Sequence, residues 1–93
     1  MARKNIKLEL LPCERAALLQ WTLIREVRSQ LEALASSDGI ESIIVSPTIL
    51  HWLASDLTHA IVKKDCRDEL VFELSERLDY VDRTHDGSLD SWY

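Results

Sequence analysis

Four polar residues in the middle of the chain have the types and spacing that metal binding or proton transfer requires. His51, Ser55 and His59 are four positions apart, and Asp56 precedes His59 by three. Positions three and four apart share one face of a helix, so these imidazoles and this carboxylate can converge there. A metal site usually needs a third ligand with its own hydrogen-bond partners, and the pattern does not identify one. We therefore expect an ordinary packed or hydrogen-bonded helix face, and keep His51, Asp56 and His59 for the alternative hypothesis of a small metal-dependent protein or enzyme.

Other motifs for catalysis or cofactor binding are absent from the sequence. Gly39 and Gly87 are the only glycines, and neither lies between a strand and a helix as a phosphate-binding loop requires. There is no Gly-x-Ser-x-Gly motif and no Cys-x-x-Cys pair. Cys13 and Cys66 are most simply interpreted as two lone buried thiols. The main interpretation therefore includes no catalytic residue, no cofactor and no metal.

Acidic residues in the last third of the chain indicate a different kind of site. The net charge is −5, and residues 65–93 contain nine acidic and three basic side chains. Nucleic acids and anionic membranes bind clustered lysine and arginine, so an acidic chain favours neither as a partner. It favours a basic or mixed protein surface instead, and the alternative is a solvated helix face and tail that keeps the protein soluble. The candidate interaction residues are Glu69, Glu73, Glu76 and Asp79 on the exposed side of a helix, with Trp92 as an apolar anchor.

Two strand-to-helix junctions organise the elements that carry these groups. In each, a short extended run is followed by proline, at Pro12 and at Pro47. Proline has no amide hydrogen to lose in the first helical turn and already has a helical φ, so a helix is expected to begin at each. Apolar alternation over residues 6–10 and a β-branched run over residues 42–45 predict the preceding strands. Ser46 is placed to cap the second helix.

Helical periodicity covers most of the remaining chain. Apolar residues recur every three or four positions over residues 12–35, 47–63 and 66–81, which predicts three helices. The first of them leaves room for a kink at Thr22 and Leu23. We expect Arg15 and Arg77 to face water, and Trp21 and Trp52 to be core or interface anchors. We expect Asp65 to cap the third helix.

These elements predict an α+β fold in the order β-α-β-α-α, with a small two-stranded sheet packed against three helices. Residues 1–83 are expected to form one domain, and residues 84–93, which lack periodicity, a mobile acidic C-terminal tail. A strand-helix-strand unit ordinarily closes as a parallel pair with a right-handed crossover. Two strands expose backbone groups on both edges unless helices or a second copy of the chain cover them, so homodimerisation is a structural hypothesis.

Four short motifs are distributed over the predicted elements. They are Leu8-Glu9-Leu10-Leu11-Pro12-Cys13-Glu14-Arg15, Asp56-Leu57, Asp68-Glu69-Leu70 and Glu76-Arg77-Leu78-Asp79-Tyr80. They resemble a group of short uncharacterised bacterial proteins of planctomycete type, in which a strand is followed by a Thr-Pro-x-Glu-Arg helix start. The resemblance implies the same β-α-β-α-α order. The group has no known activity, so the resemblance implies no site.

The sequence as a whole favours an interaction protein over an enzyme. No apolar run is long enough to span a membrane, and the first residues do not form an apolar signal core, so we expect a cytoplasmic location and no membrane partner. The leading hypothesis is a small soluble protein-protein interaction or regulatory module that binds another protein or self-associates. A further hypothesis, an antitoxin-like neutraliser of a basic partner, uses the same acidic residues.

Overall fold

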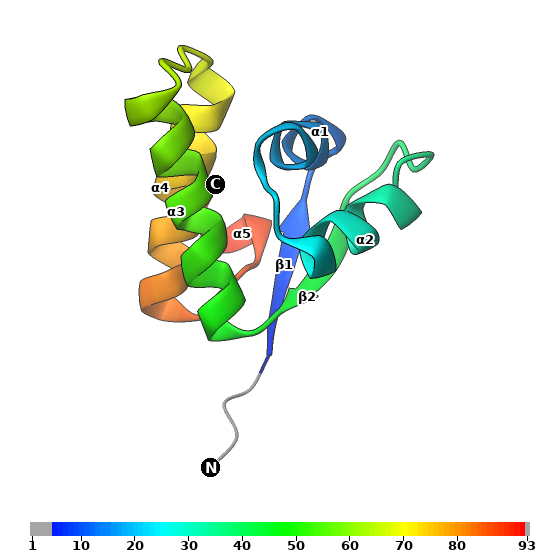
Figure 1. The fold of residues 1–93 in the computed structure, drawn as a ribbon. Helices are drawn as coiled ribbons and strands as arrows, with labels where there is room; N and C mark the ends of the chain where they lie inside the picture. The colour runs from blue at the N-terminus through cyan, green and yellow to red at the C-terminus, as the bar shows by residue number, and fades with distance from the viewer. Residues whose placement is uncertain (1–4, 93) are drawn as a thin grey trace.

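Two strands, each followed by helices, make up residues 5–92, the part of the chain that this computed structural model describes (Figure 1). Their bounds are β1 Ile6–Leu10, α1 Pro12–Trp21, α2 Arg25–Ala33, β2 Glu41–Val45, α3 Pro47–Lys63, α4 Glu69–Thr84 and α5 Leu89–Trp92. The predicted α+β class and the two-stranded sheet are confirmed. The order differs in detail, because two helices instead of one lie between the strands and a short helix follows α4.

Both strand-to-helix junctions are present as predicted. Pro12 begins α1 and Pro47 begins α3. Ser46 caps α3, since its hydroxyl oxygen accepts a hydrogen bond of 3.1 Å from the amide three residues further on. Leu11 occupies the equivalent position before α1 but has no side-chain acceptor. There the carboxylate of Glu14 reaches back and accepts from the Leu11 amide at 2.9 Å, which is one half of a capping box.

The segment expected to form one helix over residues 12–35 forms two. α1 ends at Trp21, and Thr22 and Ile24 have extended backbone with ψ angles of 143° and 114°. Thr22 is buried, and its hydroxyl donates to the carboxylate of Asp56 on α3 at 2.8 Å. The kink that the sequence allowed is therefore a complete break, fixed by a tertiary hydrogen bond that periodicity cannot indicate.

The two strands pair antiparallel, so the parallel pairing expected of a strand-helix-strand unit is wrong. Leu10 at the end of β1 lies beside Glu41 at the start of β2, and Ile6 lies beside Val45. The break after α1 is the reason. A single crossover helix would return the chain to the start of β1, whereas α1 and α2 at an angle to each other deliver it to the end of β1.

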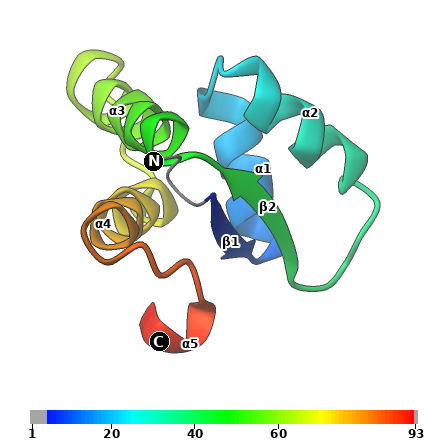
Figure 2. The ribbon, with the colours of Figure 1, turned by 90° about the horizontal axis from the view of Figure 1, so that it is seen from below.

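The core lies between one face of the sheet and helices α1 to α4, with α2 contributing Val27 and Leu31 (Figures 1 and 2). Every second residue of β1 is buried there, from Ile6 to Leu10, and Ile43 and Val45 of β2 face the same side. The helices α3 and α4 pack side by side as a hairpin, while α2 lies beside β2 on the side away from α4 (Figure 2). Within the described residues, no helix has the length and apolar character needed to cross a membrane.

The start of α4 differs from the expectation. The helix begins at Glu69, and its cap is Asp68, whose carboxylate accepts from the amide of Leu70 at 3.0 Å. Asp65 was expected to be the cap, but it has a φ of 54° and lies in the turn that follows α3. The left-handed conformation at Asp65 is tolerated by aspartate better than by most residues, and it delays the next helix by one turn.

The segment after α4, expected to be a mobile tail, lies against β1 (Figure 1). His85 ends α4 in the left-handed conformation, with a φ of 59°. The carbonyl of Gly87 then accepts from the amide of Glu9 at 2.9 Å, and Leu89 is buried. Residues 85–90 are thus attached to the domain in this structure, and their mobility stays a prediction.

Candidate functional site

The four acidic residues proposed for interaction lie on one side of α4. All of them are exposed, and their spacings of three and four positions place them within about a third of the helix circumference. None of the four carboxylates has a hydrogen bond or an ion pair with another described residue. Phe72, which is 37% exposed, lies on the same side. We call this surface the acidic face; it consists of Glu69, Phe72, Glu73, Glu76 and Asp79.

Trp92, the proposed apolar anchor, is the last residue of α5. Its side chain falls outside the part of the chain that the structure describes. The helix that carries it is attached to β1, because the amide of Leu89 donates to the carboxylate of Glu9 at 3.1 Å. Any use of Trp92 as an anchor therefore starts from a helix held beside the sheet.

The polar residues of α3 do not form a common site. His51 is exposed, and its Nδ1 lies 3.6 Å from the carboxylate of Asp82 on α4. Asp56 instead points toward the junction between α1 and α2, where it accepts from Thr22. His59 is exposed and bonds neither to Asp56 nor to Asp82. Over residues 5–92, no three histidine, cysteine or acidic side chains are grouped so that they could hold a metal ion.

A buried ionic group links four parts of the chain that the sequence patterns did not connect. Arg77 was expected to face water, but only 1% of it is exposed. Its Nη1 lies 3.4 Å from both carboxylate oxygens of Glu14, which is 2% exposed. Its Nη2 donates to the carbonyls of Glu9 at 2.5 Å and Gly87 at 2.9 Å. One arginine thus joins α4 to α1, to β1 and to the C-terminal segment, while its Nε has no partner among the described residues.

Arg15 has a similar structural role at the last residue of β1, so the expectation that it faces water is also wrong. Its guanidinium donates to the carbonyl of Leu10 at 3.1 Å. It also donates to the carbonyls of Ser37 and Gly39, at 2.7 and 2.8 Å. These bonds fasten the loop before β2 to the end of β1.

Helical spacing could have identified both buried arginines. Arg15 precedes the buried Leu18 by three positions, and Arg77 precedes the buried Val81 by four. Each is therefore at a position of the apolar stripe. The charge of the side chain suggested solvent, but arginine can be buried when carboxylates and carbonyls satisfy its fork of donors.

Five charged side chains of the motifs named above, none of them on the acidic face, have structural partners here. They are Glu14 and Arg15 at the start of α1, Asp56 on α3, Asp68 at the cap of α4, and Arg77 within α4. No protein-family model, curated protein or solved structure matches the chain.

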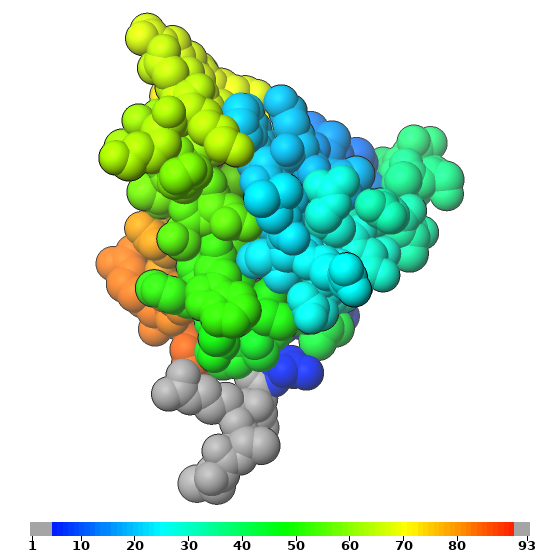
Figure 3. All heavy atoms as spheres, viewed as in Figure 1, coloured from blue at the N-terminus to red at the C-terminus, as the bar shows by residue number. Residues whose placement is uncertain are grey.

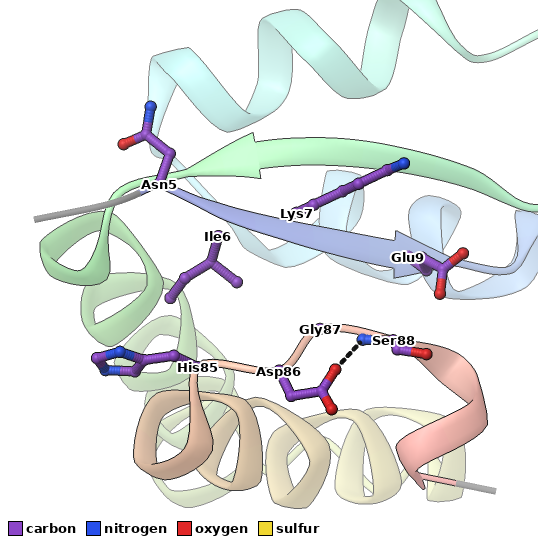
Figure 4. A pocket seen from close by; sticks show the side chains of 8 residues that line it. All are labelled: Asn5, Ile6, Lys7, Glu9, His85, Asp86, Gly87 and Ser88. Carbon is purple, nitrogen blue, oxygen red and sulfur yellow. Dashed lines mark hydrogen bonds between the residues drawn. The ribbon is translucent and has the colours of Figure 1, made fainter.

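A hollow of about 410 Å³ lies between β1 and the segment that follows α4 (Figure 4). Asn5, Ile6 and Lys7 line one side of it, and residues 85–88 line the other. In Figure 4 the carboxylate of Asp86 points along its own segment, where it accepts from the amide of Ser88 at 3.0 Å. This carboxylate shapes the attached segment and does not point across the hollow toward β1.

Proposed function

We propose that the chain is a small protein-interaction module that binds a basic protein surface through the acidic face of α4. The observation that carries the proposal is the set of four exposed carboxylates without an ion pair among the described residues. Such charges attract an oppositely charged partner at a distance and favour the correct orientation on contact. Phe72 supplies an apolar contact within the same surface.

The acidic face is carried by a helix that is firmly attached to the rest of the domain. α4 packs along α3, and Arg77 joins α4 to β1 and α1. A surface held in place before binding loses less conformational freedom on association, so more of its contact energy contributes to affinity. The rigid helix therefore favours a preformed docking surface over a segment that folds on binding.

A cytoplasmic location completes the proposal. Cys66 is buried as expected, whereas Cys13 is exposed in the first turn of α1, and both are free thiols. Free thiols persist in a reducing compartment, and an exposed one is more vulnerable to oxidation outside it.

Partner capture from a cell extract tests the proposal. The tagged protein and a triple variant, Glu69→Lys with Glu73→Lys and Glu76→Lys, are compared at about 0.15 M salt, where charges more than roughly 8 Å apart are largely screened. A matched variant reverses three exposed acids elsewhere, Glu26, Asp38 and Asp90. We expect the wild type and the matched variant to retain a basic protein and the acidic-face variant to lose it. Retention by the acidic-face variant, with an unchanged circular dichroism spectrum, would refute the proposal.

A further inference from the structure

A second exposed surface lies where the break between α1 and α2 meets α3. Leu23, within the break, is 84% exposed, and Trp52 on α3 is 56% exposed. The amide of Leu23 lies 3.4 Å from the carboxylate of Asp56, and Trp52 precedes Asp56 by one helical turn. Figure 3 shows this side of the molecule, with the cyan junction against the green α3. We call it the junction face; it consists of Trp21, Leu23, Arg25, Trp52 and Lys64.

Leu23 forms a ridge between two hollows of the junction face. One, of about 320 Å³, is lined by Trp21, His59 and Lys64 as well as by Leu23. The other, of about 340 Å³, is lined by Leu23 together with Arg25 and Arg28. An exposed leucine with a half-buried tryptophan on one side has the composition of an interface core with a polar rim.

The balance of charge at this rim is positive. Among the described residues that line the two hollows, three cations face two carboxylates: Glu32 lies 3.8 Å from Arg28, and Asp56 has no ion pair and accepts from the neutral donors of Thr22 and Leu23. Over residues 5–92, Arg25 and Lys64 have no ion pair, and they border different hollows. The junction face therefore combines an apolar ridge with one unpaired cation on each side.

The acidic face has the complementary arrangement, an exposed phenylalanine among unpaired carboxylates. We propose that the junction face binds the acidic face of a second copy of this chain. Phe72 then packs against the ridge at Leu23, and the carboxylates lie opposite Arg25 and Lys64. This inference rests on the proposed function, in that it uses the same acidic face and names the basic partner as another copy.

The two faces lie on different parts of the molecule, which determines the kind of assembly. In Figure 3 the yellow and orange residues of α4 appear only at the margin of the side that shows the junction. A contact between two unlike faces is head-to-tail, so each copy keeps one face available for a further copy. Because the charged groups are exposed, the contact weakens as salt screens them.

Sedimentation velocity with two complementary variants tests this assembly. The first variant, Glu69→Lys with Glu73→Lys and Glu76→Lys, removes the acidic face and keeps the junction face. The second, Leu23→Glu with Arg25→Glu, removes the junction face and keeps the acidic face; both residues are exposed, so the core is unchanged. We expect the wild type to form larger species as its concentration rises at low salt, and each variant alone to remain monomeric.

An equal mixture of the two variants is the decisive sample. The first variant supplies the only intact junction face and the second the only intact acidic face. These two faces bind each other, so the mixture should form a 1:1 complex and nothing larger. A wild type that stays monomeric at all concentrations overturns the inference, as does a dimer that either variant retains. Neither result depends on capture of a different basic protein, so failure here is distinguishable from failure of the proposed function.

Discussion

Replacing Arg77 by alanine should remove a large part of the stability of the domain. The change leaves the carboxylate of Glu14 buried without its cation, and the carbonyls of Glu9 and Gly87 lose a donor. Breaking a buried ion pair from one side costs about 3–5 kcal/mol. Because Glu14 keeps the Leu11 amide as a donor, we expect the lower end, about 3 kcal/mol. A domain of this length has about 5–14 kcal/mol in total.

Urea unfolding followed by tryptophan fluorescence measures this loss. With a slope of about 1–2 kcal/mol per molar urea, a loss of about 3 kcal/mol lowers the midpoint by roughly 1.5–3 M. Arg83→Ala is the matched control, because Arg83 is an exposed arginine on the same helix and bonds weakly, at 3.4 Å, to the carbonyl of Asp79. We expect that control to change the stability by about 0.5 kcal/mol or less.

A second substitution separates the cost of the unpaired Glu14 carboxylate from the cost of the lost Arg77 packing. Adding Glu14→Gln to Arg77→Ala removes the buried negative charge, so the double variant should be more stable than Arg77→Ala alone. A loss under about 1 kcal/mol for Arg77→Ala would refute the buried ion pair as a stabilising link. A double variant less stable than Arg77→Ala would show that the carboxylate is satisfied without the arginine.

Three further substitutions test individual contacts. Gly87→Ala should detach the C-terminal segment, because a Cβ there would lie 2.3 Å from the Lys7 carbonyl oxygen; faster amide exchange at residue 9 would report it, and unchanged exchange would contradict it. Gln30→Ala should expose the outer edge of β2, seen as faster exchange of the Ile44 amide, whereas equal protection would exclude Gln30 as the edge cap. Ser46→Ala should cost about 1 kcal/mol in thermal or urea unfolding through loss of the α3 cap, and no loss would contradict that role.

Local sequence patterns predict the elements of this fold better than their arrangement. Pro12, Pro47 and Ser46 mark two helix starts correctly, since proline geometry and side-chain capping depend on neighbouring residues only. The sequence indicated that a kink was possible at Thr22 but did not predict the break, because the break depends on Asp56, more than thirty positions away. The antiparallel pairing follows from that break, so the error in topology has the same origin.

For the candidate site, too, the sequence predicts local features but not contacts between distant residues. The exposure of Glu69 and Glu73 follows from helical periodicity, and the structure agrees. The pairing of Glu14 with Arg77 spans 63 positions, and periodicity on each helix cannot indicate which charges meet. Likewise, helical spacing allowed the polar side chains of α3 to converge, but His51 and Asp56 each bond to a different neighbouring element. Local sequence therefore predicts which residues share a helix face, but it does not predict which residues of other elements they contact.

The edges of the sheet bear on how the chain could assemble. At β1 the amide and the carbonyl of Glu9 bond to Gly87 and Arg77, and at β2 the amide and the carbonyl of Ile44 both bond to the side chain of Gln30 at 2.8 Å. The chain thus caps both edges itself at these positions, and the open-edge argument for a homodimer does not apply to them. Strand addition would have to displace these bonds. Assembly through the acidic and junction faces displaces none of them and depends on exposed charge, so its sensitivity to salt separates it from strand addition.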